Sequence, residues 1–173
     1  MAAEQVTATT PTMLLRMTVN GRPTELEIEP REILLDVIRD RLGLTGAKRS
    51  CDVQVCGVCT VLLNGIPVSA CCTLAYEANG KSVETVEGLA FAGQLHPIQR
   101  AFIEKGALQC GFCTSGMLLA TKALLADYPH PTPEQIKHEL AGNLCRCTGY
   151  WNIIEAVEEA ARLLAARREG GGS

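Results

Sequence analysis

Several segments within the first ninety residues alternate hydrophobic and polar side chains with the period of β-strands. Apolar residues at 15, 17 and 19, and again at 26 and 28, flank the pair Asn20-Gly21, which is typical of tight hairpin turns. A second pair, Asn64-Gly65, separates residues 60–63 from residues 66–68 in the same way. The pattern therefore predicts two β-hairpins, and residues 82–86 are expected to form a last strand.

A different spacing appears between the two hairpins. Leu34, Leu35, Ile38 and Leu42 recur at helical intervals, and Gly43 stands where a helix commonly ends. The sequence predicts a short helix here, followed by a loop over residues 46–59.

From His96 onward the apolar spacing is helical throughout. Pro97 suits the first position of a helix, and the Ala- and Leu-rich stretch 117–126 ends before Pro129. The segment 132–135, Thr-Pro-Glu-Gln, matches a capping box. We expect Gly142 to end that helix and a last helix to cover about 152–168. Four helices with short connections predict a small bundle.

Composition narrows the class of protein. The chain has 173 residues, 47% of them hydrophobic and 20% charged, with a net charge of −3. No apolar run approaches the roughly 20 residues of a membrane span, and the scattered Lys and Arg form no basic stripe for nucleic acid. The first fifteen residues lack the basic and apolar regions of a secretory signal, so the cytoplasm is the expected location.

Eight of the nine cysteines fall into two groups of four. The spacings are C-x4-C-x2-C-x11-C in the first group and C-x2-C-x31-C-x1-C in the second. The members of the first group are Cys51, Cys56, Cys59 and Cys71, and those of the second are Cys110, Cys113, Cys145 and Cys147. Two metal sites are predicted, and the first spacing opens as that of plant-type 2Fe-2S proteins does.

Zinc and disulfides are the competing interpretations of the cysteines. C-x2-C pairs also build tetrahedral zinc sites, but those sites usually draw on two similar pairs, and neither group has them. From spacing alone the second group stays open between zinc and iron-sulfur. Disulfides require an oxidising compartment, for which the N-terminus offers no signal.

Four segments together resemble the iron-sulfur small subunit of the xanthine oxidase, or molybdenum hydroxylase, family. They are residues 51–61 (CDVQVCGVCTV), 84–90 (ETVEGLA), 109–117 (QCGFCTSGM) and 142–150 (GNLCRCTGY). The similarity runs from about residue 14 to 164. It implies that the second group of cysteines, like the first, holds a 2Fe-2S cluster.

The resemblance also implies an α+β fold in two domains. Residues 13–88 would form a β-grasp domain of the plant-type ferredoxin kind, and residues 89–168 an all-α, four-helix bundle domain that binds the second 2Fe-2S cluster. Residues 1–12 and 169–173 are expected to be flexible ends.

The function implied by the resemblance is electron transfer within an oxidoreductase complex, with no substrate chemistry on this chain. Single electrons would pass between the molybdopterin centre of a large subunit and the FAD of a medium subunit. Gln109 and Cys147 would lie against the molybdopterin, and two heterotrimers would associate as a dimer. A free-standing two-cluster ferredoxin and a zinc-binding interaction module are the alternatives from other classes.

Some positions depart from the family pattern. Many relatives have Gly where this chain has Val53-Gln54, and Pro where it has Ser115. The ninth thiol, Cys72, adjoins Cys71. The resemblance assigns the ligand to Cys71, because the family places it three residues before the Leu that appears here as Leu74. Cys72 is then expected to be a small buried apolar residue.

Overall fold

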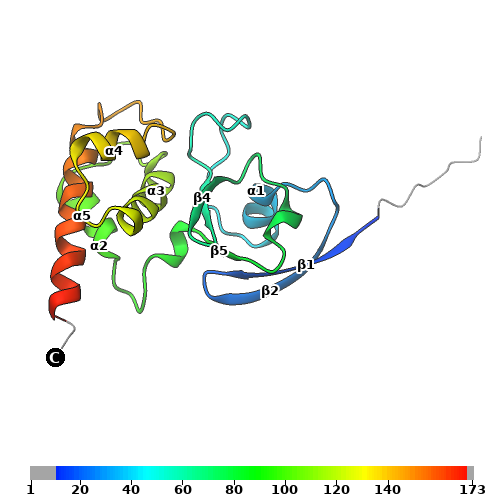
Figure 1. Ribbon diagram of the computed structural model, residues 1–173. Helices are drawn as coiled ribbons and strands as arrows, with labels where there is room; N and C mark the ends of the chain where they lie inside the picture. The colour runs from blue at the N-terminus through cyan, green and yellow to red at the C-terminus, as the bar shows by residue number, and fades with distance from the viewer. Residues whose placement is uncertain (1–10, 171–173) are drawn as a thin grey trace, which may run out of the picture.

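The computed structural model describes residues 11–170 and confirms the predicted α+β class, with a sheet in the first half and helices in the second (Figure 1). The strands are β1 (Met13–Val19), β2 (Arg22–Ile28), β3 (Thr60–Leu63), β4 (Ile66–Ser69) and β5 (Ser82–Glu84). Their order in the sheet is β2-β1-β5-β3-β4. β1 and β5 are parallel, and every other neighbouring pair is antiparallel.

Both predicted hairpins are confirmed. The turn residues Asn20 and Gly21 have φ of 50° and 78°, and Asn64 and Gly65 have φ of 50° and 83°. Positive φ at both central positions is what a type I′ turn requires, and Asn-Gly adopts it at low cost. The turns set the register, with Leu15 opposite Leu26 in the first hairpin.

The predicted short helix is present, but it is only partly α-helical. α1 covers Leu34–Asp36, and a π-helical turn follows over Val37–Arg41. The amide of Leu42 donates to the carbonyl of Val37, five residues back, and Gly43 leaves the turn with φ of 70°. The wider turn is compatible with the same apolar spacing, because Leu34, Leu35 and Ile38 are still fully buried.

The four predicted helices are α2 (Pro97–Glu104), α3 (Thr114–Asp127), α4 (Pro133–Glu139) and α5 (Trp151–Gly170). The capping box is confirmed, since Thr132 Oγ1 accepts from the Gln135 amide and Gln135 Oε1 from the Thr132 amide. The prediction that Gly142 ends α4 was wrong, because α4 already ends at Glu139 with Leu140 as its C-cap. α5 continues two residues into the expected tail, and residues 1–10 and 171–173 lie outside the described part.

Two hydrophobic cores meet along β3. Val61 and Leu63 belong to the core under the sheet, whereas Leu62 on the opposite face belongs to the core of the helices. α3 packs on β3 and β4 (Figure 1), and Lys122 of α3 pairs with Glu84 of β5. The two halves are therefore joined by apolar contact as well as by the chain. Among residues 11–170, no helix is long and apolar enough to cross a membrane.

Candidate metal centres

The structure brings the first four cysteines together as two pairs. Cys51, Cys56 and Cys59 lie on the loop that leads into β3, and Cys71 follows β4. The side chains of Cys51 and Cys56 are within hydrogen-bonding reach of each other, and so are those of Cys59 and Cys71. The first pair is half-exposed and the second is buried. The antiparallel pairing of β3 and β4 positions Cys71, because it brings the ends of the two strands together.

The loop around the first pair aims backbone N–H groups at sulfur. The amide of Val55 lies 3.4 Å from Cys51 Sγ, and backbone hydrogen bonds from Val53, Cys56 and Val55 lower the Cys51 pKa to about 6. This path requires left-handed backbone at Asp52 and Gln54, with φ of 53° and 59°. Such a conformation costs a non-glycine residue about 1 kcal/mol. Asp52 and Gln54 therefore both carry backbone strain in this loop.

The buried pair has the opposite electrostatic character. Burial, together with the neighbouring thiols of Cys71 and Cys56, raises the pKa of Cys59 to about 12. A thiol in this environment ionises when a metal cation binds and compensates the charge. Binding at this centre is therefore expected to release protons.

Cys72 differs from its prediction. It is exposed, and its Sγ lies 3.7 Å from both Cys71 Sγ and the carbonyl oxygen of Asp52. The expectation of a buried apolar residue was wrong, because Cys71 turns inward beside Cys59 and leaves the next side chain facing solvent. Burial and the contact with Cys59 favour Cys71 as the fourth member of the first group.

The second four cysteines gather in the same way from two loops of the helical half. Cys110 and Cys113 lie between α2 and α3, and Cys145 and Cys147 lie between α4 and α5. Sγ of Cys147 is 3.6 Å from Sγ of Cys110, and the Cys113 side chain hydrogen-bonds to that of Cys145. Cys110 and Cys147 are exposed, while the other pair is half-buried.

Hydrogen bonds from backbone amides and from a hydroxyl group also shift the pKa values of the thiols in the second group. A hydrogen bond from the Phe112 amide lowers the pKa of Cys110, whereas burial raises that of Cys113 to about 12. Burial opposes ionisation of Cys145, but hydrogen bonds from Thr148 and the Cys147 backbone outweigh it and lower its pKa. The Thr148 hydroxyl lies 3.2 Å from Cys145 Sγ.

Paired thiols suit a two-iron cluster. In a 2Fe-2S cluster each iron takes two cysteine thiolates and shares two sulfides with the other iron, so the ligands approach as two pairs. A tetrahedral zinc site would instead draw four ligands to one point. Both groups of cysteines therefore fit 2Fe-2S.

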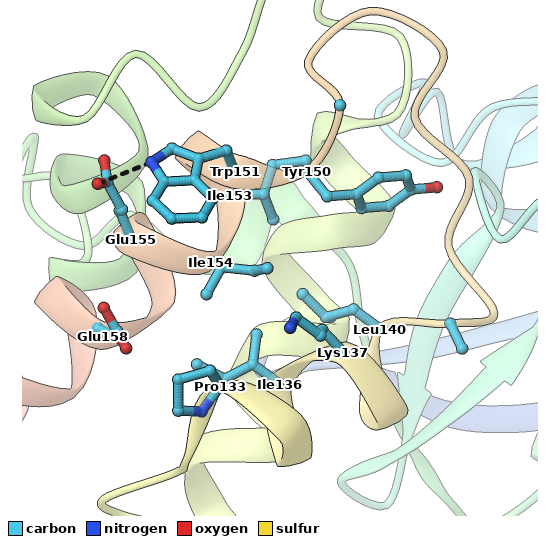
Figure 2. Close-up of a pocket in the computed structure, with 12 residues that line it drawn as sticks. Pro133, Ile136, Lys137, Leu140, Tyr150, Trp151, Ile153, Ile154, Glu155 and Glu158 are labelled. Atoms are coloured by element: carbon cyan, nitrogen blue, oxygen red, sulfur yellow. Dashed lines mark hydrogen bonds between the residues drawn. The ribbon is translucent and has the colours of Figure 1, made fainter.

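Exposed apolar side chains surround the second group. Leu108, Phe112, Leu144 and Trp151 are 39%, 44%, 48% and 71% exposed, and Gln109 is exposed next to Cys110. A groove of about 550 Å³ continues from Tyr150 and Trp151 between α4 and α5 (Figure 2). Apolar residues line most of the groove. Sequence reasoning missed it, because the apolar spacing within α4 and α5 does not show how the two helices pack against each other.

Comparison with known proteins agrees with the geometry. A model described as a 2Fe-2S iron-sulfur cluster binding domain matches residues 17–86, and one described as a 2Fe-2S binding domain matches residues 85–158. The nicotinate dehydrogenase small FeS subunit of Eubacterium barkeri is 45% identical over 151 residues, which are 87% of this chain and 96% of that protein. The nicotine 6-hydroxylase small subunit of Paenarthrobacter nicotinovorans is 49% identical over 142 residues, covering 82% and 86%.

A solved structure shows the same arrangement. A chain of quinoline 2-oxidoreductase from Pseudomonas putida 86 superposes with a TM-score of 0.86 at 46% sequence identity, covering 91% of this chain and 97% of that one. The likeness spans both halves of the protein, including the connection between them.

Proposed function

The chain belongs to the iron-sulfur small subunits of the xanthine oxidase, or molybdenum hydroxylase, family, and we propose that its eight paired cysteines hold the two clusters of such a subunit. It is the electron-transfer component of a multi-subunit oxidoreductase and carries two 2Fe-2S clusters. When bound, each cluster takes up and gives up one electron, so that the pair connects molybdopterin and FAD held by other subunits.

The observation that carries the proposal is the pairing of the thiols. Each close pair would bind one iron. The four pairs are Cys51 with Cys56, Cys59 with Cys71, Cys110 with Cys147, and Cys113 with Cys145. In each group one pair is more exposed than the other. Each cluster would therefore have one iron toward the protein surface and one toward the interior.

The partner subunits are proposed to dock beside the more exposed pair of each group. We assign the apolar surface formed by Leu108, Phe112, Leu144 and Trp151 to the large molybdopterin-binding subunit, with Gln109 and Cys147 against the pterin. Val53 and Val55, 65% and 58% exposed beside Cys51, are assigned to the medium FAD-binding subunit. Exposed apolar side chains clustered in this way are typical of protein interfaces.

The proposed assembly is a dimer of heterotrimers in the cytoplasm.

Co-purification tests the proposal. A tagged full-length chain, expressed with its genomic neighbours, should retain two larger chains that carry molybdenum and FAD. Phe112→Asp should lose the molybdenum-containing chain and keep the flavoprotein, and Val55→Asp should do the reverse. Ile66→Asp is the matched control, because Ile66 is 65% exposed on β4 outside both surfaces.

Two outcomes would contradict the proposal. Recovery of the chain alone with both clusters would support a free-standing ferredoxin. Colourless protein with stoichiometric zinc would support an interaction module.

A further inference from the structure

The Asn143 side chain lies between the two groups of cysteines and belongs to neither. It is only 7% exposed, and it stands two residues before Cys145. Its Nδ2 donates to the carbonyl oxygen of Gly57 at 2.9 Å and to Oγ1 of Thr60 at 3.2 Å. The amide group of a residue in the second cysteine loop thus binds the first cysteine loop with both of its hydrogens.

A backbone hydrogen bond runs beside this contact. The amide of Leu144 donates to the carbonyl oxygen of Cys56 at 3.0 Å. Leu144 directly precedes Cys145, so a single hydrogen bond connects one ligand residue of the first centre to the neighbour of a ligand residue of the second. Between the two cysteine groups there is consequently a short path of covalent bonds and one hydrogen bond.

Two glycines permit this close approach. A Cβ on Gly57 would lie 2.6 Å from Asn143 Nδ2, and a Cβ on Gly116 in α3 would lie 3.1 Å from the same atom and 3.2 Å from the carbonyl carbon of Gly57. On the far side, the Tyr150 hydroxyl accepts from the Cys145 amide at 2.9 Å and donates to the Asn143 carbonyl at 3.4 Å. Contacts on both sides therefore fix Asn143.

We propose that Asn143 is a positioning residue for electron transfer between the two centres. Its two hydrogen bonds hold the Cys56–Leu144 hydrogen bond closed and fix the separation of the two cysteine groups. This inference rests on the proposed ligand assignment. An electron lost at one centre is gained at the other, and no thiolate bond changes. The transfer would depend on distance and on the bonded path, so a residue that fixes both would control it without being one of the proposed ligands.

Asn143→Ala in the full-length chain with both clusters bound is the direct test. Removing two buried hydrogen bonds should make the Leu144 amide exchange with deuterium about tenfold faster. The magnetic interaction between the two reduced clusters, seen as splitting in the electron paramagnetic resonance spectrum, should weaken or disappear. Iron content and the signal of each cluster should persist. Thr60→Val keeps the shape of the side chain but removes the hydroxyl that accepts from Asn143 Nδ2 at 3.2 Å and donates to the Gly57 carbonyl at 2.7 Å. It should produce a smaller change of the same kind, because the Asn143 hydrogen bond to Gly57 remains.

Asn152→Ala is the matched control. Asn152 Nδ2 also makes two hydrogen bonds, to the carbonyls of Lys105 and Gly106 at 3.1 and 3.3 Å, but neither of them reaches the first cysteine loop. Asn152→Ala should leave the deuterium exchange of the Leu144 amide and the magnetic splitting unchanged.

Equal effects in Asn152→Ala and Asn143→Ala, or unchanged splitting and exchange in Asn143→Ala, would overturn the inference. If Asn143→Ala loses its clusters, Thr60→Val decides by the same two readouts. Absence of clusters in the unmodified chain would instead refute the proposed function.

Discussion

Replacing Gly116 with Ala should destabilise the protein, although alanine is the better helix former. Gly116 lies in the first turn of α3, and a Cβ there would overlap the carbonyl oxygen of Gly57 in the first cysteine loop. The exchange of Gly for Ala in a helix favours folding by about 1 kcal/mol. Overpacking costs about 1–3 kcal/mol, and displacing the Gly57 carbonyl weakens its hydrogen bond from Asn143, worth about 1 kcal/mol.

The net expectation is a loss of about 2 kcal/mol, or a thermal midpoint lower by about 4–8 °C for a chain of this length. Thermal unfolding followed by circular dichroism measures it on the full chain with both clusters bound. Gly142→Ala is the control, because a Cβ at that glycine would meet no atom within 4 Å. An increase in stability for Gly116→Ala would show that α3 does not press on the cysteine loop and would refute the packing of the two halves.

Three further predictions concern single positions. Ser115→Pro should raise the thermal midpoint by the equivalent of about 1 kcal/mol, because Pro is tolerated in the first turn of a helix; the buried Ser115 hydroxyl also finds no partner among residues 11–170. In the chain without clusters, alkylation of Cys51 by iodoacetamide should rise with pH to a plateau above its pKa of about 6, while Cys59, with a pKa of about 12, stays unreacted at pH 8. Peptide mass mapping would contradict this if Cys59 reacted first. Cys72→Ser should retain both paramagnetic signals and Cys71→Ser should lose or alter one; the reverse result would reassign the ligand.

The hairpins and helices could be predicted because their signals are local. Asn20-Gly21 and Asn64-Gly65 determine their turns through their own φ preferences, and Thr132 with Gln135 caps α4 through contacts three residues apart. The π-helical turn after α1 could not be predicted, since the spacing of Leu34 and Ile38 fits either kind of turn. The end of α4 was predicted wrongly at Gly142, because glycine is common both at the C-terminal ends of helices and in ordinary loops.

The contacts between the β-sheet half and the helical half could not be predicted from the sequence. The cysteine spacings indicate two centres, but nothing local shows that Asn143 reaches Gly57, 86 residues away. The apolar run of β3 gave a partial indication that this strand is covered on both faces. Strands buried on both faces read as continuous hydrophobic runs, and Leu62 does enter the helical core while Val61 faces the sheet core. The exposure of Cys72 could not be predicted either, because it depends on which of the two adjacent side chains, Cys71 or Cys72, the fold buries.

The most direct test of the two-cluster assignment is metal analysis with electron paramagnetic resonance on the anaerobically purified full-length chain. We predict about four irons and four labile sulfides per chain, with two distinct signals on reduction. Stoichiometric zinc, or reduced protein without any iron-derived signal, would contradict it.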